Sequence, residues 1–368
     1  MTLPVTVPFL DLRRETEELR GALDTAFERV LDSGVFLGGG EVAAFEEELA
    51  AWCGAREAVA VGSGTDALEF ALRAVGVGPG DEVITAASTC VPTVAAIVAS
   101  GATPVLADID PVSYTLDSDS VEDACGARTR AVVPVHLYGQ CAELTPLLEL
   151  ARERSLAVVD DAAQAHGAEL GERRVGGLCT ATAFSFYPTK NLGALGDGGA
   201  VLTDDPELAA RVRRLRSYGE IERYRSAEYG RNSRLDALQA AVLRVKLPRL
   251  DGWNDRRREL AERYDHRLAD TGLALPAESP GTRHAWHLYV VRVGERERLR
   301  EALASRGIET LVHYPRALHQ HPGYRSLARP GLEHSEELAR SALSLPLYPQ
   351  LEEDEVELVC AALDESLP

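Results

Sequence analysis

Short apolar runs alternate with amphipathic segments along the first part of the chain. Seven runs rich in β-branched or small apolar residues predict strands, and they cover residues 58–63, 82–86, 103–108, 131–136, 157–161, 183–186 and 199–203. Segments with apolar residues at helical spacing lie between many of these runs, among them residues 65–75 and 143–155. Near-continuous apolar strands that alternate with helices are typical of a mostly parallel sheet covered on both faces, so we expect an α/β fold.

The pattern changes after about residue 204, where long Arg- and Glu-rich helical segments begin. Pro248 is expected to kink or break the helical segment 233–268, because proline has no amide hydrogen to donate. A loop, a strand, a helix and a short apolar run then follow between residues 274 and 314, which predicts a small α+β unit. We therefore expect a large domain over residues 1–245 and a small C-terminal domain over residues 246–368, with the N-terminal segment packing on the small domain.

Composition and charge narrow the classes of function. The chain is 45% hydrophobic and 26% charged, and no apolar run approaches the roughly 20 residues that span a bilayer. The N-terminal residues do not begin with basic side chains followed by an apolar core, so we expect no secretory signal and a cytoplasmic protein. A formal net charge of −19 disfavours nucleic acid as a partner. The six cysteines include no C-x-x-C pair, which argues against a metal site and a disulfide framework.

The stretch "GSGTDAL", residues 62–68, lies between a predicted strand and a predicted helix. Gly62 and Gly64 permit close backbone approach, Ser63 and Thr65 offer hydroxyl groups, and the free amides of a helix N-terminus can bind phosphate. The same residues are equally consistent with a tight turn and a hydroxyl cap. The stretch matches neither the P-loop nor the dinucleotide glycine pattern, so ATP binding and a nucleotide-dependent oxidoreductase are disfavoured.

Two further stretches place polar side chains at the ends of predicted strands. "AVVDDAAQAHG", residues 157–167, directs Asp161 toward a cationic ligand atom, with a helix cap as the plainer alternative. "SFYPTKNLGALGDGG", residues 185–199, brings Ser185 and Lys190 to the same edge of the sheet. Taken alone, Lys190 is a phosphate binder, a nucleophile with a lowered pKa or a surface lysine. A phosphate cup, an aspartate for a ring nitrogen and a Schiff-base lysine together are what pyridoxal phosphate requires.

These stretches, together with "PVHLYGQ" and "NSRLDALQAAVLRVKL" in the same order, closely resemble the DegT/DnrJ/EryC1/StrS family of pyridoxal-phosphate-dependent sugar aminotransferases. The resemblance extends from "VPFLDL" near the N-terminus to "LSLPLYP" at residues 343–349. It implies the type I, aspartate-aminotransferase-like α/β fold, with a mostly parallel seven-stranded sheet in the large domain. It also implies a homodimer whose subunits share their active sites.

By position, the resemblance assigns a role to each cofactor-binding residue. Lys190 matches the lysine that binds the cofactor covalently, Asp161 the partner of the pyridine nitrogen, and Gln164 the neighbour of the ring's phenolic oxygen. The residues matched to the phosphate group are Gly64, Thr65 and Ser185, with Asn232 reaching it from the other subunit.

The resemblance is less complete at Cys90, which stands where the family often has an aromatic residue that stacks on the cofactor ring. A sulfur atom can contact a ring face but covers less of it than an aromatic side chain. Candidate substrate contacts are Tyr187, His313 and Tyr314, and weaker ones are Tyr218, Tyr224 and Arg234.

The implied reaction moves an amino group from glutamate, through pyridoxal phosphate, to a keto group of a nucleotide-linked deoxysugar in antibiotic or glycan biosynthesis. The expected nucleotide is dTDP. The loop "KNLGALGDGG" resembles enzymes that aminate a 3-keto group more than those that act on a 4-keto group. A 4-keto sugar and an inosose remain alternatives. A sugar dehydratase is disfavoured because Lys190 is retained, and a non-catalytic regulator is a remote alternative because the sequence has no basic tail.

Overall fold

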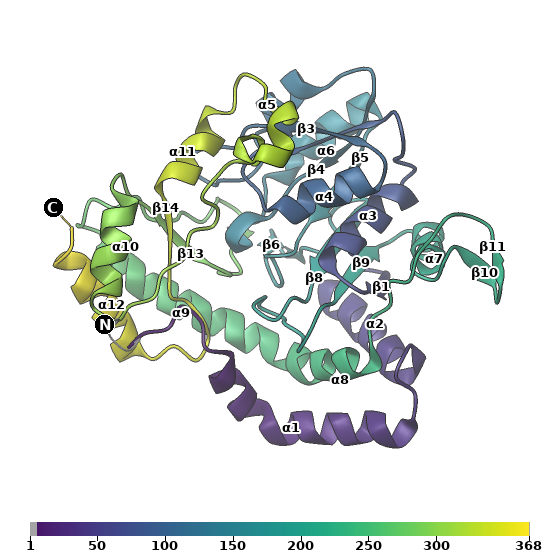
Figure 1. Ribbon diagram of the computed structural model, residues 1–368, viewed down its shortest axis with the longest axis horizontal. Coiled ribbons are helices and arrows are strands. Elements are labelled where there is room, and N and C mark those ends of the chain that lie inside the picture. The colour runs from purple at the N-terminus through teal and green to yellow at the C-terminus, as the bar shows by residue number, and fades with distance from the viewer. Residues whose placement is uncertain (1–5, 368) are drawn as a thin grey trace.

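The computed structural model describes residues 6–367, and a seven-stranded sheet forms its centre (Figure 1). In spatial order the strands are β1 (Glu57–Val61), β9 (Gly199–Thr203), β8 (Ala181–Ser185), β5 (Ala157–Asp161), β4 (Thr129–Val133), β2 (Glu82–Ala86) and β3 (Thr103–Ala107). In this sheet β9 runs antiparallel to both of its neighbours, and the other pairings are parallel. The strands fall on the seven predicted runs, and the predicted α/β fold with a mostly parallel seven-stranded sheet is confirmed.

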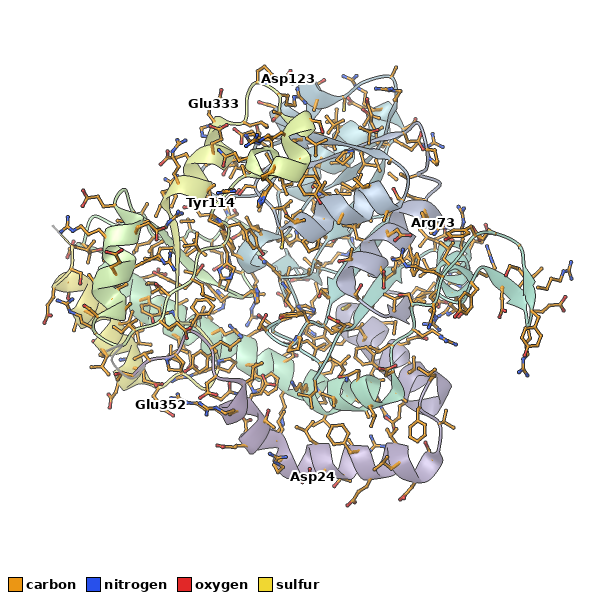
Figure 2. The ribbon with its side chains drawn as sticks, viewed as in Figure 1. Asp24, Arg73, Tyr114, Asp123, Glu333 and Glu352 are labelled. Atoms are coloured by element: carbon orange, nitrogen blue, oxygen red, sulfur yellow. The ribbon has the colours of Figure 1, made fainter. Side chains whose placement is uncertain are left out.

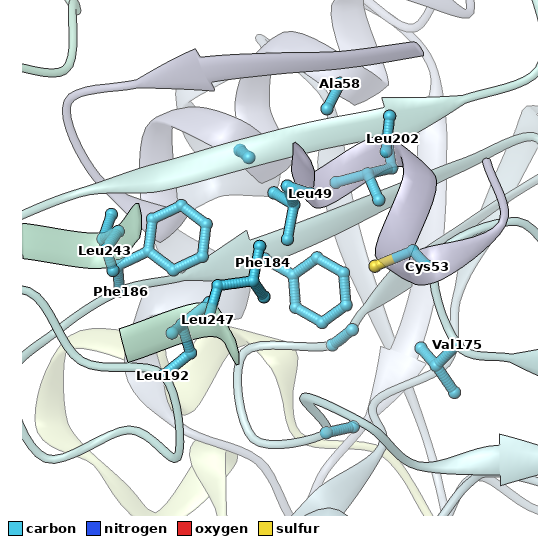
Figure 3. Packing of buried hydrophobic residues seen from close by; sticks show 14 of the residues in the cluster. Leu49, Cys53, Ala58, Val175, Phe184, Phe186, Leu192, Leu202, Leu243 and Leu247 are labelled. Atoms are coloured by element: carbon cyan, nitrogen blue, oxygen red, sulfur yellow. The ribbon is translucent and has the colours of Figure 1, made fainter. Parts of the chain in front are cut away.

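Helices cover both faces of the sheet because alternate residues of each strand point to opposite sides. One face packs against α3 (Gly64–Ala74), α4 (Val91–Ala99) and α7 (Pro206–Leu215). The helices on the other face are α2 (Gly39–Cys53), α8 (Ala237–Lys246), α5 (Ser118–Ala124) and α6 (Leu144–Arg154). Figure 3 shows part of this second face, where Phe184 and Phe186 pack among Leu49 and Leu243. Burial on both sides explains why the strands read as unbroken apolar runs.

A long helical segment connects the sheet to the C-terminal elements. Helix α8 packs against α1 (Leu12–Ser33) and α2, and ends at Lys246. A 3-10 turn, η2 (Leu247–Arg249), contains Pro248 and leads into α9 (Leu250–Leu268), so the expected break at this proline is present. Helix α9 then runs away from the sheet (Figure 1). No helix within residues 6–367 combines the length and apolarity needed to cross a membrane.

The C-terminal elements have an apolar core of their own. It joins α9 to the antiparallel pair β13 (Tyr289–Arg292) and β14 (Ala342–Leu345), and to α10 (Arg296–Ala304) and α12 (Glu353–Asp364). Val7 is fully buried in this core and forms a parallel bridge with Ile308, so the N-terminal segment packs here. The domain boundary at residue 245 stays a prediction, and residues 1–5 lie outside the described residues.

The remaining elements are short. They are β6 (Glu169–Leu170), β7 (Arg173–Arg174), β12 (Thr282–Arg283), η1 (Leu137–Gly139), η3 (Leu318–Gln320), η4 (Pro322–Leu327) and α11 (Glu333–Ser341). A hairpin of β10 (Glu220–Glu222) and β11 (Arg225–Ser226) projects from the body beside α7 (Figure 1). Arg73, labelled in Figure 2, donates a hydrogen bond to the carbonyl of Tyr229 near the base of this hairpin. Tyr224 and Tyr229 are more than four-fifths exposed, at 83% and 85%.

Candidate active site

A cavity of about 380 Å³ lies at the carboxyl ends of the parallel strands. This is where a sheet of this type places its ligands, because the loops after the strands converge there. The loops after the strands contribute Ser63, Gly64, Thr65, Thr89, Cys90, Leu137, Asp161, Gln164, Ser185, Tyr187 and Lys190, and the C-terminal region adds His287, His313 and Tyr314. The structure therefore brings together the candidate residues of three distant sequence stretches.

The turn between β1 and α3 forms one wall of the cavity. Ser63 caps α3, and its Oγ accepts a hydrogen bond from the amide of Asp66 at 3.1 Å. A Cβ atom at Gly64 would lie 2.5 Å from Cβ of Ser185, which is closer than two carbon atoms can pack. Glycine at this position therefore allows the N-terminus of α3 to approach the end of β8. The helix dipole and the free amides of this first turn favour an anionic group in the cavity.

Asp161 lies at the end of β5 and is 9% exposed. Its Oδ2 accepts a hydrogen bond from Oγ1 of Thr93 at 2.8 Å, and its Oδ1 accepts one from the amide of Ala163 at 3.1 Å. Burial raises the pKa of this carboxyl group, while the hydrogen bonds from Thr93 and Ala163 oppose the rise. Asp161 is thus oriented by its neighbours and does not cap a helix.

Lys190 lies in the turn after β8, and its amide donates to the carbonyl of Tyr187 at 2.9 Å. Burial lowers the pKa of its amine, and the nearby Asp161 and Cys90 oppose this change. Within residues 6–367, no carboxylate lies within ion-pair distance of the Lys190 amine. The cavity consequently contains a buried carboxyl group and a partly buried amine that do not form an ion pair with each other.

Gln164 is held by two hydrogen bonds from different segments. Its Oε1 accepts from the amide of Tyr138 at 2.6 Å, and its Nε2 donates to Oη of Tyr314 at 3.0 Å. Tyr138 also donates its hydroxyl hydrogen to the carbonyl of His313. These contacts tie the loop after β4 to the C-terminal region across the cavity.

Three other predicted residues line the cavity in different settings. Cys90 immediately precedes α4 and is partly buried, and burial raises the pKa of its thiol. Tyr187 is 53% exposed and lies at the rim. His313 has its Nδ1 2.8 Å from Oγ of Ser344, and burial lowers the pKa of its ring to about 4. His313 is therefore uncharged at neutral pH.

Several polar residues of the cavity lining were not predicted from the sequence, among them Thr89, Thr93, Thr189, Asp197 and His287. Thr93 bonds Asp161, and His287 lines the cavity with its Nδ1 3.0 Å from Oδ1 of Asn191, the residue after Lys190. The polar Thr93 in an otherwise apolar helix was a usable signal. His287 gave none, because its contact with the lysine segment is set by tertiary structure alone.

The segment around the β10–β11 hairpin does not reach the cavity of its own chain. Asn232 is exposed, and its Oδ1 accepts a hydrogen bond from Nε of Arg234 at 2.9 Å. Tyr218 and Tyr224 are 49% and 83% exposed and, like Arg234, lie outside the cavity lining. The role of Asn232 across a subunit interface stays a prediction.

The match to a known family covers nearly the whole chain. Residues 18–364 match the model of the DegT/DnrJ/EryC1/StrS aminotransferase family. The chain belongs to this family. The resemblance inferred from its motifs is confirmed, and with it the conclusion that the chain is an aminotransferase.

Curated relatives and solved structures of this aminotransferase family are similar over their full lengths. A dTDP-3-amino-3,4,6-trideoxy-alpha-D-glucose transaminase of Streptomyces venezuelae is 50% identical over 362 residues, which is 98% of this chain and 96% of the relative. The erythromycin biosynthesis sensory transduction protein EryC1 of Saccharopolyspora erythraea is 49% identical over 360 residues, which is 97% of this chain and 98% of the relative. The crystal structure of S. venezuelae DesV in complex with a ketimine intermediate superposes with a TM-score of 0.96, at 50% identity and with 99% and 98% of the two chains covered.

Proposed function

We propose that this aminotransferase moves an amino group from glutamate, by way of pyridoxal phosphate, to the 3-keto group of a dTDP-linked deoxysugar. The observation that carries the proposal is the placement of Lys190 and Asp161 in one cavity, where Asp161 is buried, Lys190 is partly buried and neither is paired with the other. Removing an amine and a carboxyl group from water is costly, and a ligand that lies between them and bonds both offsets this cost.

The side chains of the cavity fit pyridoxal phosphate at both ends. The α3 N-terminus, with Gly64, Thr65 and Ser185, supplies amides and hydroxyl groups suited to the phosphate. The carboxylate of Asp161 is suited to a protonated ring nitrogen, and the amide of Gln164 to the phenolic oxygen. Cys90 would contact the ring, with a smaller contact area than an aromatic side chain provides.

When bound, pyridoxal phosphate supplies an aldehyde that condenses with amines and a ring that accepts electrons. Asp161 and Lys190 then control the protonation of the cofactor ring and the transfer of a proton. Asp161 keeps the ring nitrogen protonated, because a carboxylate next to that nitrogen favours its charged form. Lys190 would take a proton at its Nζ from the α-carbon of the amino donor and deliver it to the carbon of the cofactor that carried the aldehyde, and its lowered pKa makes the neutral amine available for this step.

The substrate assignment rests on the relatives. One of them, 50% identical over 98% of this chain, is named for a dTDP-3-amino sugar, which supports a 3-keto acceptor in an antibiotic deoxysugar pathway. Tyr187, His313 and Tyr314 line the cavity and are the proposed contacts of the sugar. The name of another relative describes a sensory protein, but an intact Lys190 and Asp161 in one cavity favour catalysis here.

We further propose that the enzyme is a homodimer with shared active sites. Asn232, Tyr218, Tyr224 and Arg234, near the β10–β11 hairpin, are exposed and lie outside the cavity of their own chain. In a symmetric dimer each copy would contribute this segment to the cavity of its partner. Asn232 would then meet the phosphate group from the second subunit.

The test uses purified protein loaded with pyridoxal phosphate. We expect absorbance in the visible range that bleaches or shifts when glutamate is added, and expect Lys190→Ala to abolish amino transfer. Offering dTDP-linked 3-keto and 4-keto sugars and an inosose in parallel, with identification of the product by mass spectrometry and NMR, tests the acceptor. A colourless protein in the presence of excess cofactor would refute the proposal, as would full activity of Lys190→Ala.

A further inference from the structure

A second cavity of about 330 Å³ adjoins the first. The two share Thr189, His287 and His313 as lining residues, so they meet beside the lysine segment. Apolar side chains supply most of the second lining, namely Phe9, Leu10, Leu12, Leu288, Leu311 and Leu347. Its two charged residues are Arg257 and Glu309, and they differ in exposure: Glu309 is exposed, whereas Arg257 is 4% exposed. The cavity therefore has an acidic rim and a buried cation.

The guanidinium of Arg257 is only partly satisfied by the protein. Its Nη1 donates to the carbonyls of Leu347, Trp286 and His287 at 2.8, 3.2 and 3.4 Å. Nε and Nη2 have no hydrogen-bond partner within residues 6–367, and Nε is buried. Over the same residues no carboxylate forms an ion pair with this side chain. Burial lowers the pKa of Arg257 to about 10, so it still carries its charge at neutral pH.

A buried charge with no carboxylate in direct contact is unfavourable. Glu15 lies close enough for its charge to favour the guanidinium, but Glu15 forms its ion pair with Lys246, and the three carbonyls contribute dipoles but no net charge. Nη2, unlike Nε, is not sealed off by the surrounding protein, so its N–H groups are the part of the guanidinium that a ligand can reach. A carboxylate oxygen is a strong acceptor for such a charged donor. An anion that enters the second cavity would therefore complete the partners of Arg257.

We propose that the second cavity is the subsite for the distal carboxylate of a dicarboxylic amino donor, and that Arg257 binds this carboxylate. The proposal rests on the proposed aminotransferase function and adds the reason why that enzyme uses glutamate. The donor's amino group lies on the Lys190 side, and its side chain passes Thr189 and His287 into the second cavity. The apolar walls contact the methylene groups of the donor, and the guanidinium contacts the carboxylate.

The diphosphate of a sugar nucleotide is the competing anion, and the cavity fits it less well. One guanidinium neutralises one carboxylate, whereas a diphosphate carries more charge and would be repelled more strongly by Glu309 at the rim. The cavity also has no second cation among its lining residues, which are all described. A single carboxylate on a short aliphatic chain is therefore the best match.

The experiment compares ligands and variants of the cofactor-loaded enzyme. Calorimetry with glutarate and with butyrate measures whether a second carboxylate is recognised, independently of catalysis. We expect wild type to prefer glutarate by about 10- to 100-fold, the usual effect of a charge-assisted hydrogen bond, and Arg257→Gln to lose this preference. Arg257→Lys should retain part of it. Arg256→Gln is the matched control, because Arg256 is also on α9 but bonds Glu259 and Glu353 and lines neither cavity.

The two half-reactions give a second measurement. In Arg257→Gln, the glutamate concentration for half-maximal conversion of the cofactor should rise about 10- to 100-fold. The same variant loaded with pyridoxamine phosphate should react with the keto-sugar at close to the wild-type rate. A defect confined to the sugar half-reaction would overturn the proposal in favour of the diphosphate. If Arg257→Gln slows both half-reactions equally and keeps the preference for glutarate, Arg257 has only a structural role and the proposal is overturned.

Arg257→Gln loses three hydrogen bonds to carbonyls, so a comparison on wild type guards against misfolding of the variant. L-norvaline has the chain length of glutamate without the distal carboxylate, and we expect it to require at least tenfold higher concentrations. Equal use of norvaline and glutamate would overturn the proposal. Reaction with norvaline but not with glutamate would refute the proposed donor as well. Reaction with glutamate but transfer to no keto-sugar would refute only the proposed acceptor.

Discussion

Thr93 donates a hydrogen bond from Oγ1 to Oδ2 of Asp161 at 2.8 Å, and this bond joins the first turn of α4 to the end of β5. Oγ1 of Thr89 lies 3.0 Å from Oγ1 of Thr93 and extends the chain of hydroxyl groups. The other carboxylate oxygen of Asp161 accepts from the amide of Ala163. With both oxygens bonded, the carboxylate has one orientation in the cavity, and its charged form is favoured against the cost of burial.

Replacing Thr93 tests this relationship. Thr93→Val keeps the shape of the side chain but removes the donor, so the pKa of Asp161 should rise further. We expect pyridoxal phosphate to bind about tenfold more weakly, as for the loss of one hydrogen bond to a charged group. Absorbance titration of the cofactor-free protein measures the affinity. Thr93→Ser keeps the hydroxyl and should bind nearly as tightly as wild type; equal affinity of the valine variant would contradict the role of Thr93.

Lys190 should destabilise the cofactor-free protein in a pH-dependent way. Burial lowers the pKa of its amine in the folded state below the usual 10.5, so the folded protein binds fewer protons than the unfolded chain between these two values. The resulting loss of stability is complete below the folded-state pKa and disappears as the pH rises toward 10.5. Lys190→Met removes the charge and should therefore raise the free energy of unfolding at pH 7.

Urea unfolding of the cofactor-free proteins at pH 7 and pH 10 measures this effect. The difference between Lys190→Met and wild type should shrink at the higher pH, because the free-energy cost of releasing the amine's proton on folding falls as the pH approaches 10.5. Lys190→Arg remains charged throughout and should gain no stability at either pH. A methionine variant that is less stable than wild type at pH 7 would show that the protonated Lys190 amine does not destabilise the folded protein.

The close contact between Gly64 and Ser185 leads to a third prediction. Gly64→Ala places a methyl group 2.5 Å from Cβ of Ser185 and must push α3 away from β8. We expect a loss of about 1–3 kcal/mol in the free energy of unfolding, together with weaker cofactor binding. Gly40→Ala is the matched control in α2, because a Cβ there has no neighbour within 4 Å, and it should be neutral or gain up to about 1 kcal/mol. Similar urea midpoints for the two variants would argue against the tight contact.

The fold was predictable where local pattern and tertiary structure agree. The strands are buried on both faces, so each appears in the sequence as a short apolar run, and Pro248 marks the break between α8 and α9. Helix α4 was not predicted because its sequence, "VPTVAAIVA", has apolar residues on nearly all sides and no helical period. Such a segment reads equally well as a strand.

Only those site residues that belong to a recognisable sequence motif were predictable. Lys190, Asp161 and the Gly64 turn carry motif signals and converge on one cavity, although their individual roles stay predictions. Thr93 and Arg257 act through contacts with residues far away in the chain, on β5 and around residues 286–287 and 347. Thr93 leaves a local signal only as the single polar residue of an apolar helix, and Arg257 leaves none among the many arginines of its helix. A buried arginine without a carboxylate partner becomes visible only when the cavity around it is known.

A second buried carboxylate, Asp160, should support the end of β5 from the opposite face. Its Oδ1 accepts from Oγ1 of Thr182 at 2.8 Å, and its Oδ2 lies 2.9 Å from Nε2 of His136. Nδ1 of His136 accepts from the amide of Ala142, so Nε2 carries the hydrogen and donates to Asp160. Asp160, Thr182 and His136 are fully buried, at 0% exposure.

Asp160→Ala leaves both buried donors without a partner. We expect a loss of about 3–5 kcal/mol in the free energy of unfolding, the range for breaking a buried polar pair. Asp160→Asn retains one acceptor and should lose less. Urea unfolding with the cofactor present and absent measures both variants. An alanine variant within 1 kcal/mol of wild type, on the order of a surface substitution, would show that the cluster contributes little.

The shared active site predicts complementation between two variants that are each defective on their own. Lys190→Ala should be inactive because it removes the amine, and Asn232→Ala should be weakly active because it removes a phosphate contact supplied by the partner subunit. In a heterodimer of the two, one cavity carries both changes and the other carries neither. We therefore expect purified heterodimers to recover about half of the wild-type activity, since one of two symmetric sites is intact.

The control pairs Lys190→Ala with Asp161→Ala. Both residues line the cavity of the same chain, so each site of that heterodimer lacks one of them and no activity should return. Recovery in the first heterodimer and none in the second assigns Asn232 to the partner's site, because only a residue supplied across the interface can be complemented by a chain that lacks Lys190. If verified Lys190→Ala/Asn232→Ala heterodimers stay inactive, Asn232 acts within its own chain or not at all, and the exposed hairpin segment has another role.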